Sequence, residues 1–153
     1  AEDQDLQQQI REDRKLVGPF LEEVLRVEGS TKATFRIASR GTRIGDMEIP
    51  AGKRVVVSLS AANRDPRRWE DPAEFRLGRP KIKEHLAFGR GAHTCAGAPL
   101  ARAEVAVLLD RFLEHTSAIT LDEARHGPAG SRTIEYEPSY IIRGLANLHI
   151  KLA

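Results

Sequence analysis

The only cysteine of the chain, Cys95, lies in a glycine-rich loop that precedes a segment of helical character. The loop, residues 88–97, reads Phe-Gly-Arg-Gly-Ala-His-Thr-Cys-Ala-Gly. Free N–H groups and the positive dipole at a helix N-terminus favour a thiolate over a thiol. Glycines let a backbone pass close to a bulky partner and present N–H groups to a sulfur. An anionic, metal-binding sulfur is one interpretation, and a small buried apolar side chain is the other.

His93 stands two residues before Cys95, so the two side chains share a face of an extended loop. This spacing allows a nucleophile and base pair like that of a cysteine hydrolase, although nothing in the loop would orient the imidazole. Zinc is disfavoured, because His85, His93 and Cys95 offer at most three ligands. Covalent c-type haem attachment needs Cys-x-x-Cys-His, which is missing. A phosphate-binding loop is excluded because position 94 is Thr and no Rossmann context surrounds it.

Glu23 and Arg26 are three residues apart, so on a helix both side chains project from one face. The simplest interpretation of such a pair is a solvated surface contact worth about 0.3–0.5 kcal/mol. The spacing of apolar residues predicts this helix over 19–27, beginning near Pro19 and ending at Gly29.

Two further segments have helical character. Residues 5–10 form the first, and the stronger pattern runs from Pro99 or Leu100 to His115. The expected apolar face of the second helix consists of Leu100, Ala101, Val105, Leu108, Leu109, Phe112 and Leu113.

Short β-branched or aromatic segments predict antiparallel hairpins between these helices. They are residues 35–38, 42–44, 47–49 and 54–58, and the unbroken apolar run of the last indicates a buried strand. Residues 61–80 carry turn signals and little regular structure. Two apolar runs, 140–142 and 145–152, predict paired terminal strands. With no repeat and no internal linker, the pattern is that of one α+β unit.

Composition narrows the class of protein. The chain has 153 residues and 17.0 kDa, which suits one domain or part of one. A net charge of +2, evenly scattered, is too small for a nucleic-acid footprint. No apolar run approaches the roughly 18 residues of a membrane-spanning helix, and the acidic, Gln-rich start differs from a secretory signal. A single cysteine fits a reducing cytoplasm. Because the only Met is Met47, we expect a fragment or a processed product.

Three motifs together resemble the C-terminal, haem-binding part of a bacterial, soluble cytochrome P450. The loop from Phe88 through Cys95 to Gly97, continued by Ala-Pro-Leu-Ala-Arg, is similar to the cysteine-ligand signature of that family. Residues 23–26, Glu-Val-Leu-Arg, match its Glu-x-x-Arg element. Phe75 followed by Arg79, after Asp71-Pro72, resembles the segment that adds a second arginine. The resemblance spans the whole chain.

The resemblance implies an α+β fold, the C-terminal haem-binding portion of a single domain over residues 1–153. Its parts would be the helix with Glu-x-x-Arg, a small antiparallel sheet, an irregular meander, the cysteine-ligand loop, a long helix and a terminal β-hairpin. It also implies haem b, with Cys95 as proximal thiolate ligand of the iron. Arg36 would bind the propionates as a cation and His93 as a hydrogen-bond donor, and Phe88 would pack near the sulfur and tune its potential.

Further residues receive roles from the same resemblance. Gly89, Gly91 and Gly97 would let the loop approach the porphyrin. Glu23, Arg26 and Arg79 would form a buried ionic triad, in which loss of one member would cost about 3–5 kcal/mol. The positions that would lie near substrate are Ala33, Thr34, Ile141 and Ile142.

The implied activity of the complete protein is that of a haem-thiolate monooxygenase, which inserts one oxygen atom from O2 into a small apolar substrate. A ferredoxin-type protein would supply electrons, and the candidate docking charges are Arg67, Arg68, Arg90 and Arg102. Arg102 has the alternative of being tied into the fold. No partner role for nucleic acid or membrane is expected, and the expected location is cytoplasmic.

Two departures from the family pattern support an alternative. Gly29-Ser30-Thr31 replaces a Pro-Pro-Val-like stretch, and neither the N-terminal half nor the distal helix with its acid–alcohol pair is found in these 153 residues. The alternative is a truncated piece, haem-free or self-associating, without independent activity. Its partner would be the missing N-terminal half or a second copy.

Overall fold

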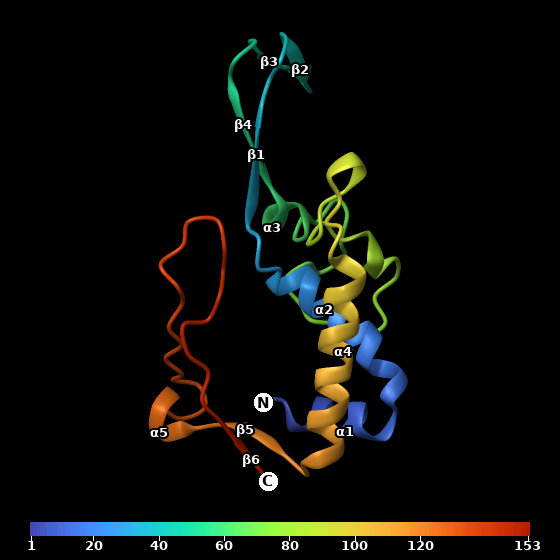
Figure 1. The fold of residues 1–153 in the computed structure, drawn as a ribbon, viewed down its shortest axis with the longest axis vertical. Coiled ribbons are helices and arrows are strands. Elements are labelled where there is room, and N and C mark those ends of the chain that lie inside the picture. The colour runs from blue at the N-terminus through green and yellow to red at the C-terminus, as the bar shows by residue number, and fades with distance from the viewer.

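The computed structural model describes all 153 residues, and Figure 1 shows three regions. Helices α1 (Gln4–Glu12), α2 (Val17–Glu28) and α4 (Ala98–His115) lie side by side in one body. A narrow arm of strands projects from that body, and the C-terminal segment forms a loop region beside it. The mixture of helices and small antiparallel sheets confirms the α+β prediction. No helix is both long and apolar enough to cross a membrane.

The three predicted helices are present, each extended by one or a few residues. An Asp3 carboxylate that accepts from Leu6 N–H at 2.8 Å caps α1. The buried apolar cluster joins Ile10 of α1, Val17 of α2 and Leu113 of α4. This contact lies near the C-terminal end of α4, so it anchors the helix at the end away from the cysteine loop.

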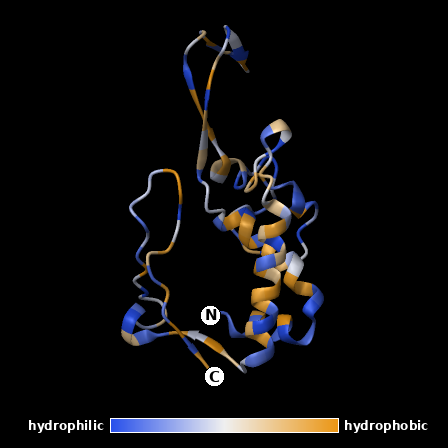
Figure 2. Ribbon diagram, in the orientation of Figure 1, coloured by the Kyte–Doolittle hydropathy of each residue, from blue (hydrophilic) through white to orange (hydrophobic).

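The apolar face predicted for α4 is buried only in part. Leu113 is 7% exposed, whereas Leu100 and Leu108 are 63% and 56% exposed. Figure 2 shows apolar residues along much of α4 and on part of α2. Within these 153 residues, no second layer covers that side of α4.

The arm consists of two short antiparallel pairs. Strand β1 (Ala33–Ile37) pairs with β4 (Arg54–Ser58), and β2 (Thr42–Ile44) pairs with β3 (Met47–Ile49) through a turn at Gly45, whose φ is +57°. The hairpin prediction is confirmed. The predicted burial of 54–58 is wrong, because Val55 is only half-buried and the other four residues are exposed. A two-stranded ribbon without a covering layer leaves both of its faces open.

The terminal segments pair differently from the prediction. Residues 140–142 form no strand, and in the second run only residues 150–152 form one, β6 (Ile150–Leu152). It pairs with β5 (Ile119–Leu121), which precedes the short helix α5 (Glu123–His126) in the chain. The chain does fold back between 136 and 145 through a single bridge. The 140–143 backbone bonds instead to the segment after α2, where Lys32 N–H donates to the Ile141 carbonyl at 2.8 Å. The pairing of these terminal segments therefore depends on residues far away in the sequence, which a local pattern does not reveal.

Glu23 and Arg26 are completely buried rather than solvated. Arg26 donates to both oxygens of Glu23 at 2.9 and 2.8 Å and to three backbone carbonyls of the irregular segment 63–74. Arg79 Nε donates to Glu23 Oε1 at 3.0 Å, and the buried Trp69 ring lies 5.6 Å from the Arg26 guanidinium. The pair thus fixes the course of residues that follow helix α3 (Leu59–Ala62) and have almost no regular structure.

Replacement of Glu23 by Gln is expected to lower the free energy of unfolding by about 3–5 kcal/mol, because Arg26 and Arg79 would keep a buried charge without a carboxylate. Chemical denaturation of the two proteins measures this. A matched control is Glu114→Gln, which breaks an exposed pair with Arg111 and should cost at most about 1 kcal/mol. Equal losses in both variants would contradict the assignment.

Because Glu23 is ionised in this contact, the free energy of unfolding is expected to depend on pH in the acid range. Burial acts to raise the pKa of Glu23, but hydrogen bonds from Arg26, Arg76 N–H and Arg79 outweigh it and hold the pKa below its ordinary value. Its stabilising contribution is therefore present above the unfolded-state pKa, about 4.3, and is lost as the pH falls through the folded-state pKa. Unfolding free energies measured at several acid pH values should fall less steeply in Glu23→Gln.

Candidate functional site

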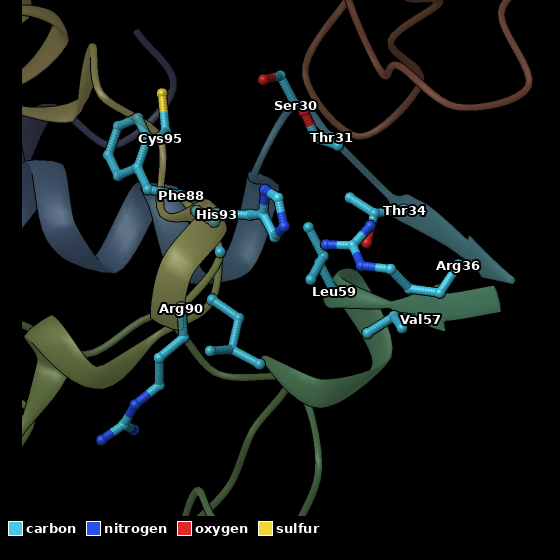
Figure 3. Close-up of a pocket in the computed structure, with 13 residues that line it drawn as sticks. Ser30, Thr31, Thr34, Arg36, Val57, Leu59, Phe88, Arg90, His93 and Cys95 are labelled. Atoms are coloured by element: carbon cyan, nitrogen blue, oxygen red, sulfur yellow. The ribbon is translucent and has the colours of Figure 1, made fainter. Parts of the chain in front are cut away.

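A hollow of about 480 Å³ lies between the cysteine loop and the base of the β1–β4 arm. Figure 3 shows side chains entering it from both sides. Cys95, Phe88 and His93 come from the loop, whereas Thr34 and Arg36 come from β1. Residues about 60 positions apart in the sequence thus meet around one space. Such a concave, partly apolar region with a few convergent polar groups is the usual setting of a ligand site.

Cys95 is exposed at this hollow, so the interpretation as a buried apolar side chain is wrong. Its N–H donates to the Phe88 carbonyl at 2.9 Å, and Thr94 N–H donates to the Gly91 carbonyl at 3.0 Å. Gly89 and Gly91 have φ of +69° and +82°, the left-handed region that other residues adopt only at a cost. These contacts close the loop and present the thiol outward, immediately before α4 begins at Ala98.

Gly97 keeps the space beside the sulfur clear. A methyl group in place of its hydrogen would lie 3.8 Å from Cys95 Sγ. That is an ordinary contact distance, so another residue could be built there, but its side chain would share the space next to the thiol.

Arg36 and His93 approach the hollow from opposite walls. In Figure 3 the Arg36 guanidinium and the His93 imidazole point toward one another, and both residues are exposed. Arg36 Nη1 donates to the Phe35 carbonyl at 2.8 Å, which leaves its other N–H groups for a ligand. A cation and an imidazole donor together suit carboxylate groups.

The structure does not support a cysteine hydrolase or a zinc site. Figure 3 shows the imidazole of His93 directed toward Arg36, and no hydrogen bond joins it to Cys95. A base must lie within hydrogen-bond reach of its nucleophile. No group of three or more His, Cys, Asp or Glu side chains is arranged to hold a metal ion.

The positions expected near substrate are brought together only in part. Thr34 lines the hollow. Ile142 forms a bridge with Thr31, which also lines the hollow, so Ile141 and Ile142 lie at its edge with exposed side chains. Ala33 is half-buried in β1 opposite Ser58 and is not a lining residue.

The four candidate docking arginines have different surroundings. Arg67 and Arg68 are exposed but pair with Asp65 and Glu84. Arg90 is exposed and belongs to the residues that line the hollow, and in Figure 3 its guanidinium lies on the side away from Arg36. Arg102 is tied into the fold by Glu22, which is the alternative weighed from the sequence.

Sequence reasoning missed the network around Glu22. His85 Nε2 lies 2.9 Å from Glu22 Oε2, and Arg102 donates to both carboxylate oxygens at 2.6 and 3.0 Å. Burial acts to raise the pKa of Glu22, but hydrogen bonds from Arg102 and His85 outweigh it and lower the pKa. Burial also lowers the pKa of His85. The available signal was a second glutamate beside Glu23, with a histidine and an arginine on either side of the loop.

Comparisons with known proteins give one consistent result. The sequence profile described as Cytochrome P450 matches residues 1–128. Cytochrome P450 144 of Mycobacterium tuberculosis is 44% identical over 115 residues, 75% of this chain and 26% of that protein. Cyclomarin C epoxidase CymV of Salinispora arenicola is 37% identical over 111 residues, 72% of this chain and 28% of that protein.

Solved structures extend the similarity to the fold. The substrate-free cytochrome P450 CYP150A6 of Mycobacterium marinum superposes with a TM-score of 0.96 and 50% identity, over 99% of this chain and 37% of that one. The chain thus spans between 26% and 37% of the lengths of these relatives. Because a family profile covers most of its residues and a half-identical structure shares its fold, the chain belongs to the cytochrome P450 family.

Proposed function

We propose that residues 1–153 are the C-terminal haem-binding portion of a single domain in a haem-thiolate monooxygenase. The complete protein would insert one oxygen atom from O2 into a small apolar organic substrate. The observation that supports this most is the exposed Cys95 thiol at the same hollow as Arg36 and His93, in a chain of the cytochrome P450 family. Membership of this family implies haem as the cofactor, and we propose haem b.

The residues around the hollow suit that group. A porphyrin needs an open apolar face next to its ligand, and Cys95 is exposed with Phe88 and Leu86 among its neighbours in the lining. It also needs cationic or donor groups for its two propionates, and Arg36 with His93 supplies them. Gly89 and Gly91 let the loop backbone take the left-handed turns that expose the thiol.

Each residue then has a stated task. Haem, when bound, would supply the iron at which O2 is activated. Cys95 would bind that iron through its sulfur and donate electron density that favours O–O cleavage. Phe88 would cover the sulfur and keep water from it, and Arg36 and His93 would hold the propionates. Thr34, Ile141 and Ile142 would form part of the substrate wall. Ala33 does not line the hollow, and its part would be to place the neighbouring Thr34 through the backbone of β1.

The reaction class has support beyond the site. One relative, CymV, is named for epoxidation of cyclomarin C, and epoxidation is an insertion of oxygen into an organic molecule. We propose an apolar substrate, because Ile141 and Ile142 leave exposed apolar surface at the edge of the hollow. A cysteine that must remain a free thiolate also suits a reducing cytoplasm, which is the location we propose.

A second candidate is a haem-free or self-associating piece without independent activity. The observation that favours it is the exposed apolar surface of α4, where Leu100, Val107 and Leu108 are all more than half exposed. Contiguous apolar surface of this kind drives association. Its partner would be the N-terminal half of a cytochrome P450 domain or a second copy of the chain.

Replacement of Cys95 by Ser is expected to abolish the red-shifted Soret band of thiolate ligation in the reduced, CO-bound protein, because serine supplies no thiolate. Absorption spectra after reconstitution with haem measure this. The control is Ala96→Ser, which adds the same hydroxyl to the exposed neighbouring position and should keep the band. An unchanged band in Cys95→Ser would contradict the ligand assignment. A folded wild-type chain without any such band would favour the second candidate.

Replacement of Arg36 by Gln is expected to weaken haem binding about 10- to 100-fold, because a charge-assisted hydrogen bond is worth about 1.5–3 kcal/mol. Haem transfer to a competing acceptor protein measures the affinity. Arg43→Gln, on the same arm but paired with Asp46 at 3.6 Å, is the control and should not change it. Equal affinities in both variants would count against Arg36 as a propionate ligand.

We propose an acidic ferredoxin-type electron donor, with Arg90 as the most available docking charge. Arg67, Arg68 and Arg102 already have carboxylate partners. Arg90→Glu is expected to slow reduction by an acidic ferredoxin several-fold at low salt and less at high salt, since exposed charges are screened. Stopped-flow reduction at two ionic strengths measures this, with Arg111→Glu on the far part of α4 as control. Equal slowing in both variants would argue against docking at Arg90.

A further inference from the structure

One buried carboxylate holds both flanks of the cysteine loop. Glu22 of α2 contacts His85, ten residues before Cys95, and Arg102, seven residues after it. The Glu22 and His85 side chains are 6% and 1% exposed, and that of Arg102 is 33% exposed. Every residue of the loop therefore lies between two attachments to the same carboxylate.

The hydrogen bonds of His85 define its proton. Its Nδ1 accepts from Ala87 N–H at 3.1 Å, so Nδ1 carries no hydrogen. The hydrogen must then be on Nε2, which donates to Glu22 Oε2 at 2.9 Å. One imidazole thus connects the carboxylate to a backbone N–H directly before Phe88.

Phe88 is the point at which these contacts reach Cys95. The Arg102 guanidinium lies 4.6 Å from the centre of the Phe88 ring, and the His85 ring lies 6.4 Å from it. The Phe88 carbonyl accepts from Cys95 N–H at 2.9 Å. The contacts therefore run from Glu22 through Arg102 and Phe88 to the backbone N–H of Cys95.

The neighbouring Glu23 serves another part of the chain. Its partners are Arg26, Arg79 and Arg76 N–H, all of which belong to α2 or the irregular segment before residue 80. No partner is shared with Glu22. Two successive carboxylates of α2 thus attach two different segments, and the network of Glu22 can be perturbed by itself.

We propose that Glu22, His85 and Arg102 are positioning residues that hold Phe88 in its hydrogen bond with Cys95 and set the electrostatic environment of the Cys95 sulfur. This deepens the proposed function, since it rests on Cys95 as the ligand of haem iron. Reduction of the site adds negative charge, which a nearby cation favours and a nearby anion disfavours. In the intact network the charges of Glu22 and Arg102 offset each other.

This balance predicts shifts of opposite sign. Glu22→Gln leaves the Arg102 cation beside Phe88 without its carboxylate, so the reduction potential should rise. Arg102→Met leaves the Glu22 carboxylate without its cation, so the potential should fall. If the substitutions only loosened the loop, the sulfur would become more exposed in both variants, and the potential would shift in the same direction in both.

The experiment uses the full-length, haem-loaded protein. Spectroelectrochemical titration gives the potentials of wild type, Glu22→Gln and Arg102→Met. The matched controls are Glu114→Gln and Arg111→Met, which break an exposed pair on the same helix with an N–O distance of 2.6 Å. Both controls should retain the wild-type potential. If Glu22→Gln fails to fold, Arg102→Met and the exchange measurement described next carry the test, because Arg102 is the more exposed partner. A potential that rises in Arg102→Met would then overturn the proposal.

A second readout needs no haem. Amide hydrogen exchange at Ala87 and Cys95 in the haem-free protein should be about tenfold faster or more in His85→Phe and in Arg102→Met, and unchanged in Arg111→Met. Opposite potential shifts with faster loop exchange would support the proposal. Shifts of the same sign, or exchange equal to wild type, would overturn it. A wild-type protein without thiolate-bound haem would instead refute the proposed function, while the exchange measurement still tests the network.

Discussion

The buried contact between Glu23 and Arg26 determines the course of the longest irregular segment that packs on helix α2. Both side chains are removed from water, and a buried charge is tolerated only when its hydrogen-bonding capacity is filled. Arg26 fills its capacity with carbonyls of Asn63, Pro72 and Glu74. Because these carbonyls belong to a segment with almost no regular structure, the need to satisfy one guanidinium determines its course. Residues 63–80 lack regular secondary structure, but their hydrogen bonds to Arg26 hold them in a defined place.

Helix α2 consequently holds both the irregular segment and the cysteine loop in place. Its two adjacent carboxylates point to different segments: Glu23 to the irregular segment, and Glu22 to both flanks of the cysteine loop. The glycines of the loop then set its shape, since Gly89 and Gly91 adopt backbone angles that favour glycine. An exposed thiol thus stands on a support that is largely buried. Rigid support beneath an open reactive group is what a ligand site requires.

The open side of the site is built from distant parts of the chain. Arg36 reaches the hollow from the β1–β4 arm, and Ile141 and Ile142 reach its edge through backbone contacts with residues 31 and 32. Much of the apolar surface of α4 remains exposed. Relatives of the cytochrome P450 family are much longer than this chain, which aligns with 26% to 37% of their lengths. We propose that the rest of such a domain would cover α4 and close the hollow.

Local patterns in the sequence were enough to predict the helices, the hairpins of the arm and the position of the cysteine loop, because helical periodicity, turn residues and glycine act over a few residues. The family resemblance also indicated which segments of the chain would lie close together. Three features became visible only in the folded chain: the exposure of β4, the pairing of Ile150–Leu152 with Ile119–Leu121, and the contacts of Glu22 with His85 and Arg102. Burial, strand pairing and the choice of ion-pair partner depend on residues far apart in the chain, which no local pattern records.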